Sequence, residues 1–463
     1  MSLILRQYQN DIIDKTRALM RNGNKSVCVV APTGAGKTIL IAYMLKSSAE
    51  KGISSWFICH RRELIHQAMA AFKAVGLRFG VVSAGFHYES APLVKICSIS
   101  TLIKRWHKIP LPKLIIWDEC AHIAAKSWST LYKQMPNAFH IGLTAVPARL
   151  DGKGLGDYFK TMVHGPSVAW LIDNGFLSKY RIFAPATANV DGVHTRAGDY
   201  VKEELAAAMD KPSITGCAIR EYKKLADGKR AMVFAVSIEH SKHVVGQFQA
   251  AGIPAAHVDG ETNDIERDAA INSFKDGRTL VLSSVDIFSE GTDIPAVEAA
   301  ILLRPTQSLS LHLQQLGRVL RVYPNKLGAT ILDHAGNTIR HGLPDEQRTW
   351  TLAGIDKKTG SDSGESKGRT CPRCFACQKP GSPSCSFCGH IFEIKPRKVE
   401  EKEGELKEID SEEIARRRER QDQGRAQTRE ELIAIGRKRG FKNPSGWAHF
   451  VLMARRKRRL KNG

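Results

Sequence analysis

The stretch that decides the fold is residues 27–38, Val-Cys-Val-Val-Ala-Pro-Thr-Gly-Ala-Gly-Lys-Thr. It begins with an apolar run of strand length and passes through a glycine-rich turn into helix-forming sequence that starts near Ile39. The backbone N–H groups of such a turn converge on an anion, and the N-terminus of the following helix adds its positive dipole end. The stretch therefore predicts a phosphate-binding loop.

The loop predicts a role for each of its residues. Lys37 would reach the β- and γ-phosphates of a nucleoside triphosphate, and the Thr38 hydroxyl would ligate Mg²⁺. The general pattern begins with glycine, whereas this sequence has Ala31. The alternative is a glycine turn that only joins a strand to a helix, and the intact Gly-Lys-Thr argues against it. The other residues expected to hold the phosphates are Thr33, Gly34, Ala35 and Gly36.

Apolar runs of strand length alternate with helical patterns on both sides of this loop. Continuous apolar strands separated by helices indicate parallel sheets covered on both faces, so we expect an α/β fold. One alternation extends to about Ala184 and a second from about Lys211 to Pro344. The runs are residues 27–30, 56–59, 95–99 and 114–117 in the first, and 231–235, 255–258, 279–282 and 299–303 in the second.

The composition narrows the class of protein. A chain of 463 residues suggests about three units at roughly 150 residues each. The net charge of +22 attracts polyanions, with nucleic acid the leading partner and an anionic membrane surface the second. Neither a secretory signal nor a run of about 20 apolar residues is visible, so no membrane-spanning helix is expected. Five of the ten cysteines are isolated, which is typical of a reducing compartment.

A pair of carboxylates follows the apolar run 114–117. Asp118 would hold Mg²⁺ through water, and Glu119 would polarise the attacking water. A simple helix N-cap would explain Asp118 alone, but it predicts neither the second carboxylate nor His122. The stretch Asp-Glu-Cys-Ala-His resembles the DExH box of superfamily 2 helicases and translocases.

Other stretches resemble motifs of that superfamily in its order. Leu5 to Gln9 resembles the adenine-recognition motif, which implies that Gln9 contacts the base edge with Arg6 nearby. Residues 60–64 resemble motif Ia, residues 98–102 resemble the strand-contacting motif, and residues 143–149 resemble motif III with Val146 in place of its second threonine. Residues 290–295 resemble motif V, which implies nucleotide-binding roles for Gly291 and Asp293.

Residues 314–321, Gln-Gln-Leu-Gly-Arg-Val-Leu-Arg, resemble motif VI. The spacing of Arg318 and Arg321 predicts that they share one helix face and present two guanidiniums to one anion. The resemblance implies arginine fingers, which are worth roughly 10³–10⁵ in rate. Two surface arginines on an amphipathic helix are the alternative.

The resemblance covers about residues 3–345 and is nearest to bacterial and phage DNA helicases of the RadD-like and SSL2-like type. It implies two RecA-like lobes with ATP and Mg²⁺ in the cleft between them, and a cytoplasmic setting in a bacterial or phage-infected cell. His122, Thr144 and Gln314 would couple the ATP site to a nucleic-acid strand. The candidate strand contacts, inferred from motif position, are Arg62, Thr101 and Ser284.

The other five cysteines lie between residues 371 and 388, and four of them form two CxxC pairs. Two such pairs supply the four thiolates of a closed structural Zn²⁺ site. Cys377 and His390 are further possible zinc donors at short spacing. The alternatives to a zinc site are a redox switch through Cys377 and a set of unrelated free thiols. The favoured zinc ligands are Cys371, Cys374, Cys385 and Cys388.

The C-terminal segment is strongly basic. From Ala434 to Gly463 there are ten lysines or arginines and no acidic residue, with Phe441, Trp447 and Phe450 among them. Such a pattern suits a strand whose phosphates are neutralised and whose bases stack. The alternative is an amphipathic helix packed on the rest of the chain or on an anionic membrane.

The expected organisation follows from these segments. We predict a first lobe over 1–184, an interlobe linker over 185–210, a second lobe over 211–352, a flexible linker over 353–370, a zinc ribbon over 371–394 and a basic tail over 395–463.

The predicted function is an ATP-dependent helicase or translocase, acting on DNA in replication, repair or recombination. An RNA helicase of the same superfamily is one alternative. Another is a nucleic-acid-binding adaptor with a degenerate ATPase, against which the intact Lys37, Glu119 and Arg321 argue. No nuclease constellation indicates a restriction motor subunit. No membrane partner is expected, and the sequence identifies no protein partner.

Overall fold

The chain forms two compact units in a computed structural model, Met1–Glu393 and Ile394–Gly463. The residues that the structure describes are 4–149, 152–184, 194–196, 199–201, 204, 205, 209, 212–285, 297–354, 369–371, 373, 374, 376–378, 382–392, 428–438, 440, 441 and 443–461.

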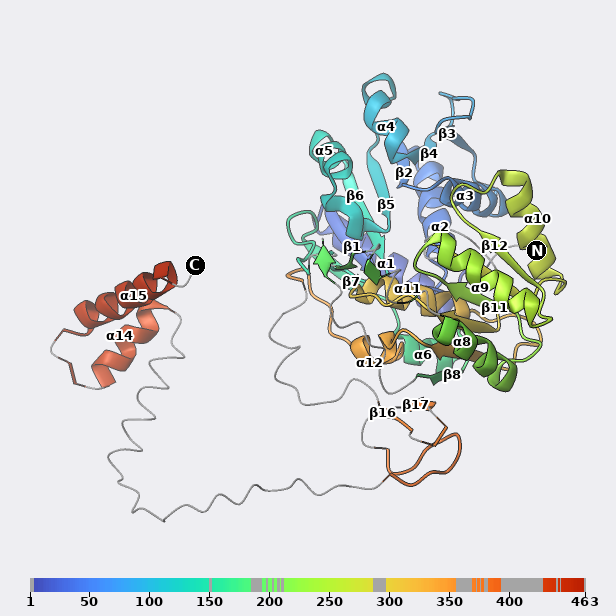
Figure 1. Cartoon of the computed structure of the whole chain (residues 1–463). Coiled ribbons are helices and arrows are strands. Elements are labelled where there is room, and N and C mark those ends of the chain that lie inside the picture. Colours follow the sequence, from blue (N-terminus) through green and yellow to red (C-terminus); the bar gives the residue numbers. More distant parts are fainter. Residues whose placement is uncertain are drawn as a thin grey trace, which may run out of the picture. The chain divides into compact units, whose positions relative to one another are not determined.

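A seven-stranded parallel sheet organises the first lobe, in the order β3-β4-β2-β5-β6-β1-β7 (Figure 1). Every residue of β1, β2, β4 and β5 is buried, because helices cover both faces of the sheet. The strands are β1 (Ser26–Val30), β2 (Ser55–Cys59), β3 (Phe79–Val82), β4 (Val94–Ser98), β5 (Leu114–Asp118), β6 (Phe139–Thr144) and β7 (Thr161–His164). The helices are α1 (Gln7–Arg21), α2 (Lys37–Glu50), α3 (Arg62–Ala74), α4 (Ile99–Arg105) and α5 (Lys126–Gln134), with short 3₁₀ turns η1 (Trp106–Lys108) and η2 (Cys120–Ala124).

The position of β6 brings the two nucleotide motifs to one edge of this sheet. It lies between β1, which ends at the phosphate loop, and β5, which ends at Asp118. Gly142 in β6 has no room for a side chain, because a Cβ there would lie 2.4 Å from Phe159 Cζ and 2.7 Å from Cys120 Sγ. The segment after Asp118 can therefore pack directly onto the sheet.

An eight-stranded sheet organises the second lobe, in the order β12-β13-β11-β14-β15-β8-β17-β16. The first six strands pair in parallel. Strand β17 pairs antiparallel with β8, and β16 pairs antiparallel with β17. The strands are β8 (Tyr180–Phe183), β11 (Ala231–Phe234), β12 (Ala255–Val258), β13 (Val281–Ser284), β14 (Ala299–Leu302), β15 (Ala329–Asp333), β16 (Arg369–Thr370) and β17 (Ala376–Gln378). The helices are α6 (Val168–Asp173), α8 (Pro212–Leu225), α9 (Ile238–Ala250), α10 (Asp264–Lys275), α11 (Leu309–Val319) and α12 (Asn337–His341). A small hairpin, β9 (Thr195–Arg196) with β10 (Asp199–Tyr200), stands apart from both sheets.

The strand β8 corrects the predicted lobe boundary at residue 184. The sequence assigns Tyr180–Phe183 to the first lobe, but this strand pairs in parallel with β15, with Tyr180 opposite Ala329. The first sheet therefore ends with β7. A run of four residues carries no mark of the sheet it joins, because its partner lies about 150 residues further along the chain.

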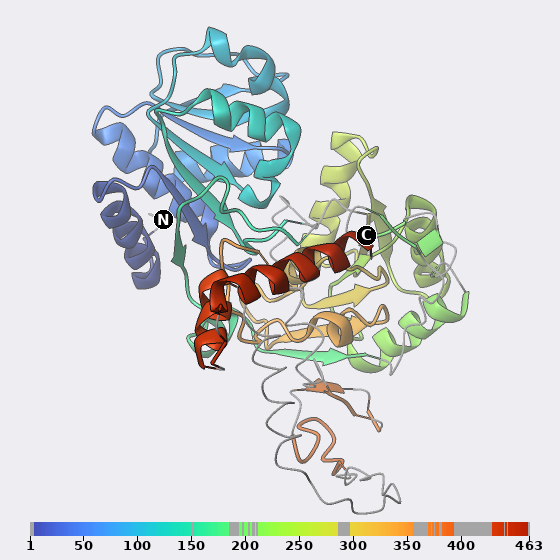
Figure 2. The same cartoon turned by 90° about the vertical axis from the view of Figure 1, so that its left-hand side faces the viewer.

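The cysteine-rich segment extends the second sheet. Strand β17 pairs with β8, with Ala376 opposite Phe183 and Cys377 opposite Ile182 (Figure 2). Cys371 and Cys385 are buried in the same apolar cluster as Phe183. The described part of this segment therefore shares a core with the second lobe.

The two lobes contact each other at several places, one of them the phosphate loop. A Cβ on Gly317 of α11 would lie 2.4 Å from Thr33 Cβ in the phosphate loop, so α11 packs directly on that loop. At a second place, Glu63 pairs with Arg267 at 3.3 Å. Both residues of this ion pair are partly buried.

The second unit contains a helical hairpin, α14 (Arg429–Lys438) and α15 (Pro444–Lys461). Leu432, Ala448 and Val451 form its small core. Trp447 packs closely on Gly436 and lies 5.1 Å from the ring of Phe441. None of the helices in the described part of the chain is both long and apolar enough to cross a membrane.

Candidate active site

The phosphate loop runs from the end of β1 to Lys37, the first residue of α2. Gly34 and Gly36 have positive φ angles of 90° and 76°, which glycine adopts most easily. Each position is also sterically closed. A Cβ on Gly36 would lie 2.6 Å from Gln9 Nε2, and one on Gly34 would lie 2.6 Å from Leu177 Cδ2. Glycine is therefore favoured at both positions by the backbone conformation, and a side chain there would also displace the ends of the Gln9 and Leu177 side chains.

Lys37 and Glu119 form an ion pair beside this loop. Lys37 Nζ lies 3.5 Å from Glu119 Oε1, and it also donates to the carbonyl of Ala31 at 3.4 Å. The two side chains are only 12% and 13% exposed, so water screens the pair weakly. The pair places the carboxylate predicted to orient water next to the cation predicted to bind phosphate.

The backbone at Glu119 is unusual. Its φ of 48° and ψ of 56° lie in the left-handed region, which non-glycine residues rarely adopt and which clusters at functional sites. Asp118, the residue before Glu119, is buried and is the last residue of β5. The 3₁₀ turn η2 begins at Cys120, directly after Glu119.

His122 and Thr144 link this site to neighbouring motifs. The His122 ring lies 4.9 Å from the ring of His60, which precedes the predicted strand-contacting Arg62. The carbonyl of Thr144 accepts from Ala31 N at 3.0 Å, while its hydroxyl bonds only locally, to the backbone of Val146. The coupling roles of both residues stay predictions, and these contacts give each a physical route.

The N-terminal motif contacts the phosphate loop. Gln9 Nε2 donates to Ala35 O at 3.1 Å, and its Oε1 accepts from Arg6 N at 2.9 Å. The Tyr8 hydroxyl donates to the same Ala35 carbonyl at 2.9 Å. The base-contacting role of Gln9 stays a prediction, and the structure adds a role in holding the loop.

Sequence reasoning missed an aromatic cluster next to this motif. Tyr8 lies 5.7 Å from Trp170 and 5.4 Å from Phe176, ring centre to ring centre. The Arg6 guanidinium lies 4.5 Å over the Phe176 ring. Because these rings are about 160 residues apart in sequence, only the adjacency of Tyr8 to Gln9 could have signalled the cluster.

Motif VI approaches from the second lobe. Gln314 is buried in α11, and Arg318 lies in its last turn. The prediction that Arg318 and Arg321 share a helix face is wrong, because α11 ends at Val319. Arg321 instead forms an isolated β-bridge with Leu177, the residue that packs on Gly34.

A cavity of about 270 Å³ lies where the two lobes meet. Thr33 lines it from the phosphate loop, and Leu313 and Gly317 line it from α11. Both lobes therefore contribute walls to a cavity beside the phosphate loop, although Lys37 and Glu119 are not among its lining residues.

The three residues predicted to contact a nucleic-acid strand differ in how exposed they are. Arg62 begins α3, is 61% exposed and lies 3.7 Å from Asp264 of the second lobe. Thr101 is half-buried on α4, whereas Ser284 is only 1% exposed at the end of β13. Gly291 and Asp293 lie outside the described residues.

The four cysteines favoured as zinc ligands come together. Their Sγ atoms all lie within 4.8 Å of one another, with Cys371–Cys388 at 3.7 Å and Cys374–Cys385 at 3.5 Å. A tetrahedral Zn²⁺ with sulfurs at about 2.3 Å requires sulfur–sulfur distances of about 3.8 Å. The donor set therefore fits zinc. Cys377 lies outside it, on β17.

Comparison with known families decides what this arrangement belongs to. Residues 2–149 match the model of the type III restriction enzyme res subunit, and residues 214–323 match that of the helicase conserved C-terminal domain. A 51.5 kDa protein of a Lactococcus phage is 34% identical over 389 residues, which is 83% of each chain. The chain belongs to the superfamily 2 helicases.

A second relative of this superfamily 2 helicase is a Saccharomyces cerevisiae protein assigned as an ATP-dependent helicase, IRC3. It is 30% identical over 359 residues, which is 72% of this chain and 52% of the yeast protein. The chain thus spans about half the length of that relative. As a superfamily 2 helicase it is an ATP-hydrolysing enzyme that acts on nucleic acid.

The fold likeness agrees with the family. A fragment assigned as the HsdR subunit of a type I restriction enzyme from Vibrio vulnificus aligns with a TM-score of 0.58 at 22% identity. The alignment covers 76% of this chain and 67% of that one. The predicted α/β fold with two RecA-like lobes is thereby confirmed.

The Lys37–Glu119 pair generates a test of the hydrolysis chemistry. Lys37→Ala should abolish ATP hydrolysis, because it removes the cation that reaches the phosphates. Glu119→Gln should still bind ATP but turn over about 10²–10⁴ times more slowly, the usual contribution of a general base. Phosphate release and binding of a fluorescent ATP analogue would measure the two effects.

The matched control is Glu50→Gln, an exposed carboxylate at the other end of α2, which should hydrolyse ATP normally. Near-normal turnover by Glu119→Gln would contradict the role assigned to Glu119.

Proposed function

We propose that this superfamily 2 helicase uses ATP hydrolysis to translocate along DNA. The observation that carries the proposal is the direct contact of α11 with the phosphate loop, next to the Lys37–Glu119 pair. A nucleotide held there would touch both lobes, so its hydrolysis can change how they pack. A further relative, the DNA 3′-5′ translocase XPB2 of Sulfurisphaera tokodaii, is 23% identical over 365 residues and supports DNA as the track.

The chain's own residues suggest how ATP would be used. Lys37 would leave Glu119 and bind the β- and γ-phosphates, which frees the carboxylate to orient the attacking water. Mg²⁺ held through Thr38 and Asp118 would neutralise charge on the phosphates. Arg318 and Arg321 would approach the γ-phosphate from the second lobe. Loss of that phosphate would remove the link between the lobes.

Strand binding would compete with an existing ion pair. Arg62, a predicted phosphate contact, faces Asp264 at 3.7 Å, and both side chains are more than 60% exposed. Such an exposed pair contributes little stability and is readily exchanged for a phosphate. Arg62 therefore remains a candidate contact in the first lobe, whereas the buried Ser284 would need a local rearrangement to reach a strand.

The decisive experiment is ATP hydrolysis titrated separately with single-stranded DNA, duplex DNA, forked DNA and RNA. DNA should stimulate turnover at lower concentrations than RNA of the same sequence. Stimulation by RNA alone would replace this proposal with an RNA helicase. Absence of any stimulation, with basal hydrolysis intact, would favour an adaptor whose ATPase serves another purpose. The phage relative supports a bacterial or phage-infected cell as the setting.

The cysteine cluster is proposed as a structural zinc site. Each CxxC pair lies on its own turn, where Cys371 N donates to Ala376 O and Gly389 N donates to Cys385 O, both at 2.9 Å. Zinc would fix the hairpins that pair with β8, because a segment this short has little core of its own. Such sites contribute roughly 10–16 kcal/mol of apparent binding energy in small zinc peptides.

Metal analysis of the purified chain should find about one zinc per chain. Cys385→Ser should lose the metal, whereas the matched variant Cys377→Ser should keep it, because Cys377 lies outside the four-thiol group. Equal zinc content in the two variants would contradict the assigned ligands.

The C-terminal hairpin is proposed as a nucleic-acid tether. The structure revises the predicted stacking residues, because Trp447 packs within the hairpin while Phe450 is 73% exposed on the same helix. Phe450 is thus the better candidate to stack on a base. Its helix continues into the basic run 455–459.

Deletion from residue 428 onward should weaken single-stranded DNA binding and leave basal ATP hydrolysis nearly intact. The salt dependence should fall by about 0.7 in log–log slope for each lost phosphate contact. Phe450→Ala alone should weaken binding by about 1–3 kcal/mol if it stacks on a base. Fluorescence anisotropy at several salt concentrations would measure both, and unchanged affinity and slope after the deletion would rule out the tether.

A further inference from the structure

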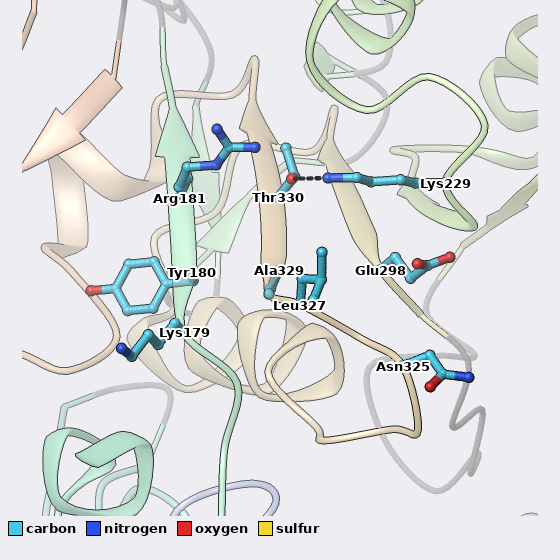
Figure 3. Close-up of a pocket in the computed structure, with 10 residues that line it drawn as sticks. Lys179, Tyr180, Arg181, Lys229, Glu298, Asn325, Leu327, Ala329 and Thr330 are labelled. Atoms are coloured by element: carbon cyan, nitrogen blue, oxygen red, sulfur yellow. Dashed lines mark hydrogen bonds between the residues drawn. The ribbon is translucent and has the colours of Figure 1, made fainter. Parts of the chain in front are cut away.

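A second cavity, of about 420 Å³, lies in the second lobe away from the phosphate loop (Figure 3). It opens at the amino ends of β8, β14 and β15 and is lined by the residues just before each strand. Three of its ten lining residues are basic: Lys179, Arg181 and Lys229. None of the ten belongs to a helicase motif described above.

The basic side chains of this cavity form no close ion pairs among the described residues, although the Glu298 carboxylate lies near enough to act on Lys229. Lys229 Nζ donates to the neutral Thr330 hydroxyl at 3.1 Å. The one carboxylate in the lining, Glu298, pairs instead with Arg230 at 3.4 Å. The cavity therefore carries an excess of positive charge.

Two of the three basic side chains, Arg181 and Lys229, converge, whereas Lys179 lies at the rim. In Figure 3, Arg181 from β8 and Lys229 from the loop before β11 reach toward Thr330 from opposite sides. Partial burial, and after it the positive charge of Arg181, lower the pKa of Lys229, and the nearby Glu298 carboxylate only partly opposes this. An anion between them would relieve this repulsion.

The surroundings of the cavity indicate which anion fits. The Arg181 guanidinium also lies 5.0 Å over the ring of Phe387 in the cysteine hairpins, and that ring is 42% exposed. Leu327 at the rim is fully exposed. A cationic pocket with aromatic and apolar surface beside it suits a strand, whose phosphates are charged and whose bases stack.

We propose that this cavity binds a backbone phosphate of the DNA on which the helicase acts, as a second contact outside the motor motifs. The inference rests on the proposed function. Arg181 and Lys229 hold the phosphate, Lys179 attracts it from the rim, and Phe387 of the cysteine hairpins provides the adjoining surface for a base. The cysteine hairpins and the second lobe thus form one binding surface.

The test compares charge reversals in the full-length chain. Lys179→Glu and Lys229→Glu are each titrated against labelled single-stranded and forked DNA over about 50–200 mM salt. The matched control is Lys160→Glu, an exposed lysine just before β7, which precedes its strand as Lys179 precedes β8 but lies outside the cavity.

Lys229→Glu should bind DNA about fivefold more weakly near 0.1 M salt, with a log–log slope lower by about 0.7, which is the share of one phosphate contact on a single strand. Lys179→Glu, at the rim of the cavity, should weaken binding by a smaller factor. Lys160→Glu should match the wild type, and Lys229→Arg should retain most of the affinity. Because Lys179 is exposed, its variant should keep the wild-type melting temperature, so weaker binding would not reflect unfolding.

Three results would overturn the inference. Affinity and slope equal to wild type in both reversals would show that no strand passes here. Unchanged DNA binding together with loss of a pyrophosphate-induced rise in melting temperature would identify a site for small free anions instead. A wild-type chain that binds no DNA would overturn the proposed function itself, which separates that failure from the failure of the cavity alone.

Discussion

The packing of Gly317 on Thr33 brings the two lobes together at the phosphate loop. A side chain at 317 would overlap Thr33, so the lobes come this close only because glycine is there. The main functional groups surround the contact. Lys37 and Glu119 pair beside the loop, and Arg318 follows Gly317 in the chain. Leu177 packs on Gly34 and forms a β-bridge with Arg321. If a nucleotide binds at this point, hydrolysis of its γ-phosphate would alter contacts in both lobes.

Local chemistry was readable from the sequence, and long-range pairing was not. The phosphate loop and the acidic pair were predictable because neighbouring residues define them, and the structure places them at one sheet edge through β6. The strand Tyr180–Phe183 was assigned to the wrong lobe, since its partner β15 is remote in sequence. Likewise, the rings of Trp170 and Phe176 reach Tyr8 only through the fold.

Predictions about side-chain direction failed where an element ended earlier than its pattern. Helical spacing placed Arg321 beside Arg318, but α11 stops at Val319 and Arg321 enters a β-bridge. Lys326 then folds back to donate to the carbonyl of Arg321. Burial of Lys326 lowers its pKa to about 8, so this cation is held at a desolvation cost. The short loop after α11 therefore fixes the backbone of Arg321, whose position the sequence pattern alone did not predict.

The pairing of β17 with β8 also protects the sheet. Without it, β8 would be the outermost strand, with one row of N–H and C=O groups open to any other extended chain. Strand β17 pairs with Ile182 and Phe183 and so covers part of that row, and the next strand, β16, is two residues long. Damage to the four thiols would therefore do more than remove a candidate metal site. It would leave β8 as an unpaired edge strand of the second lobe, and we would expect the chain to self-associate through that edge.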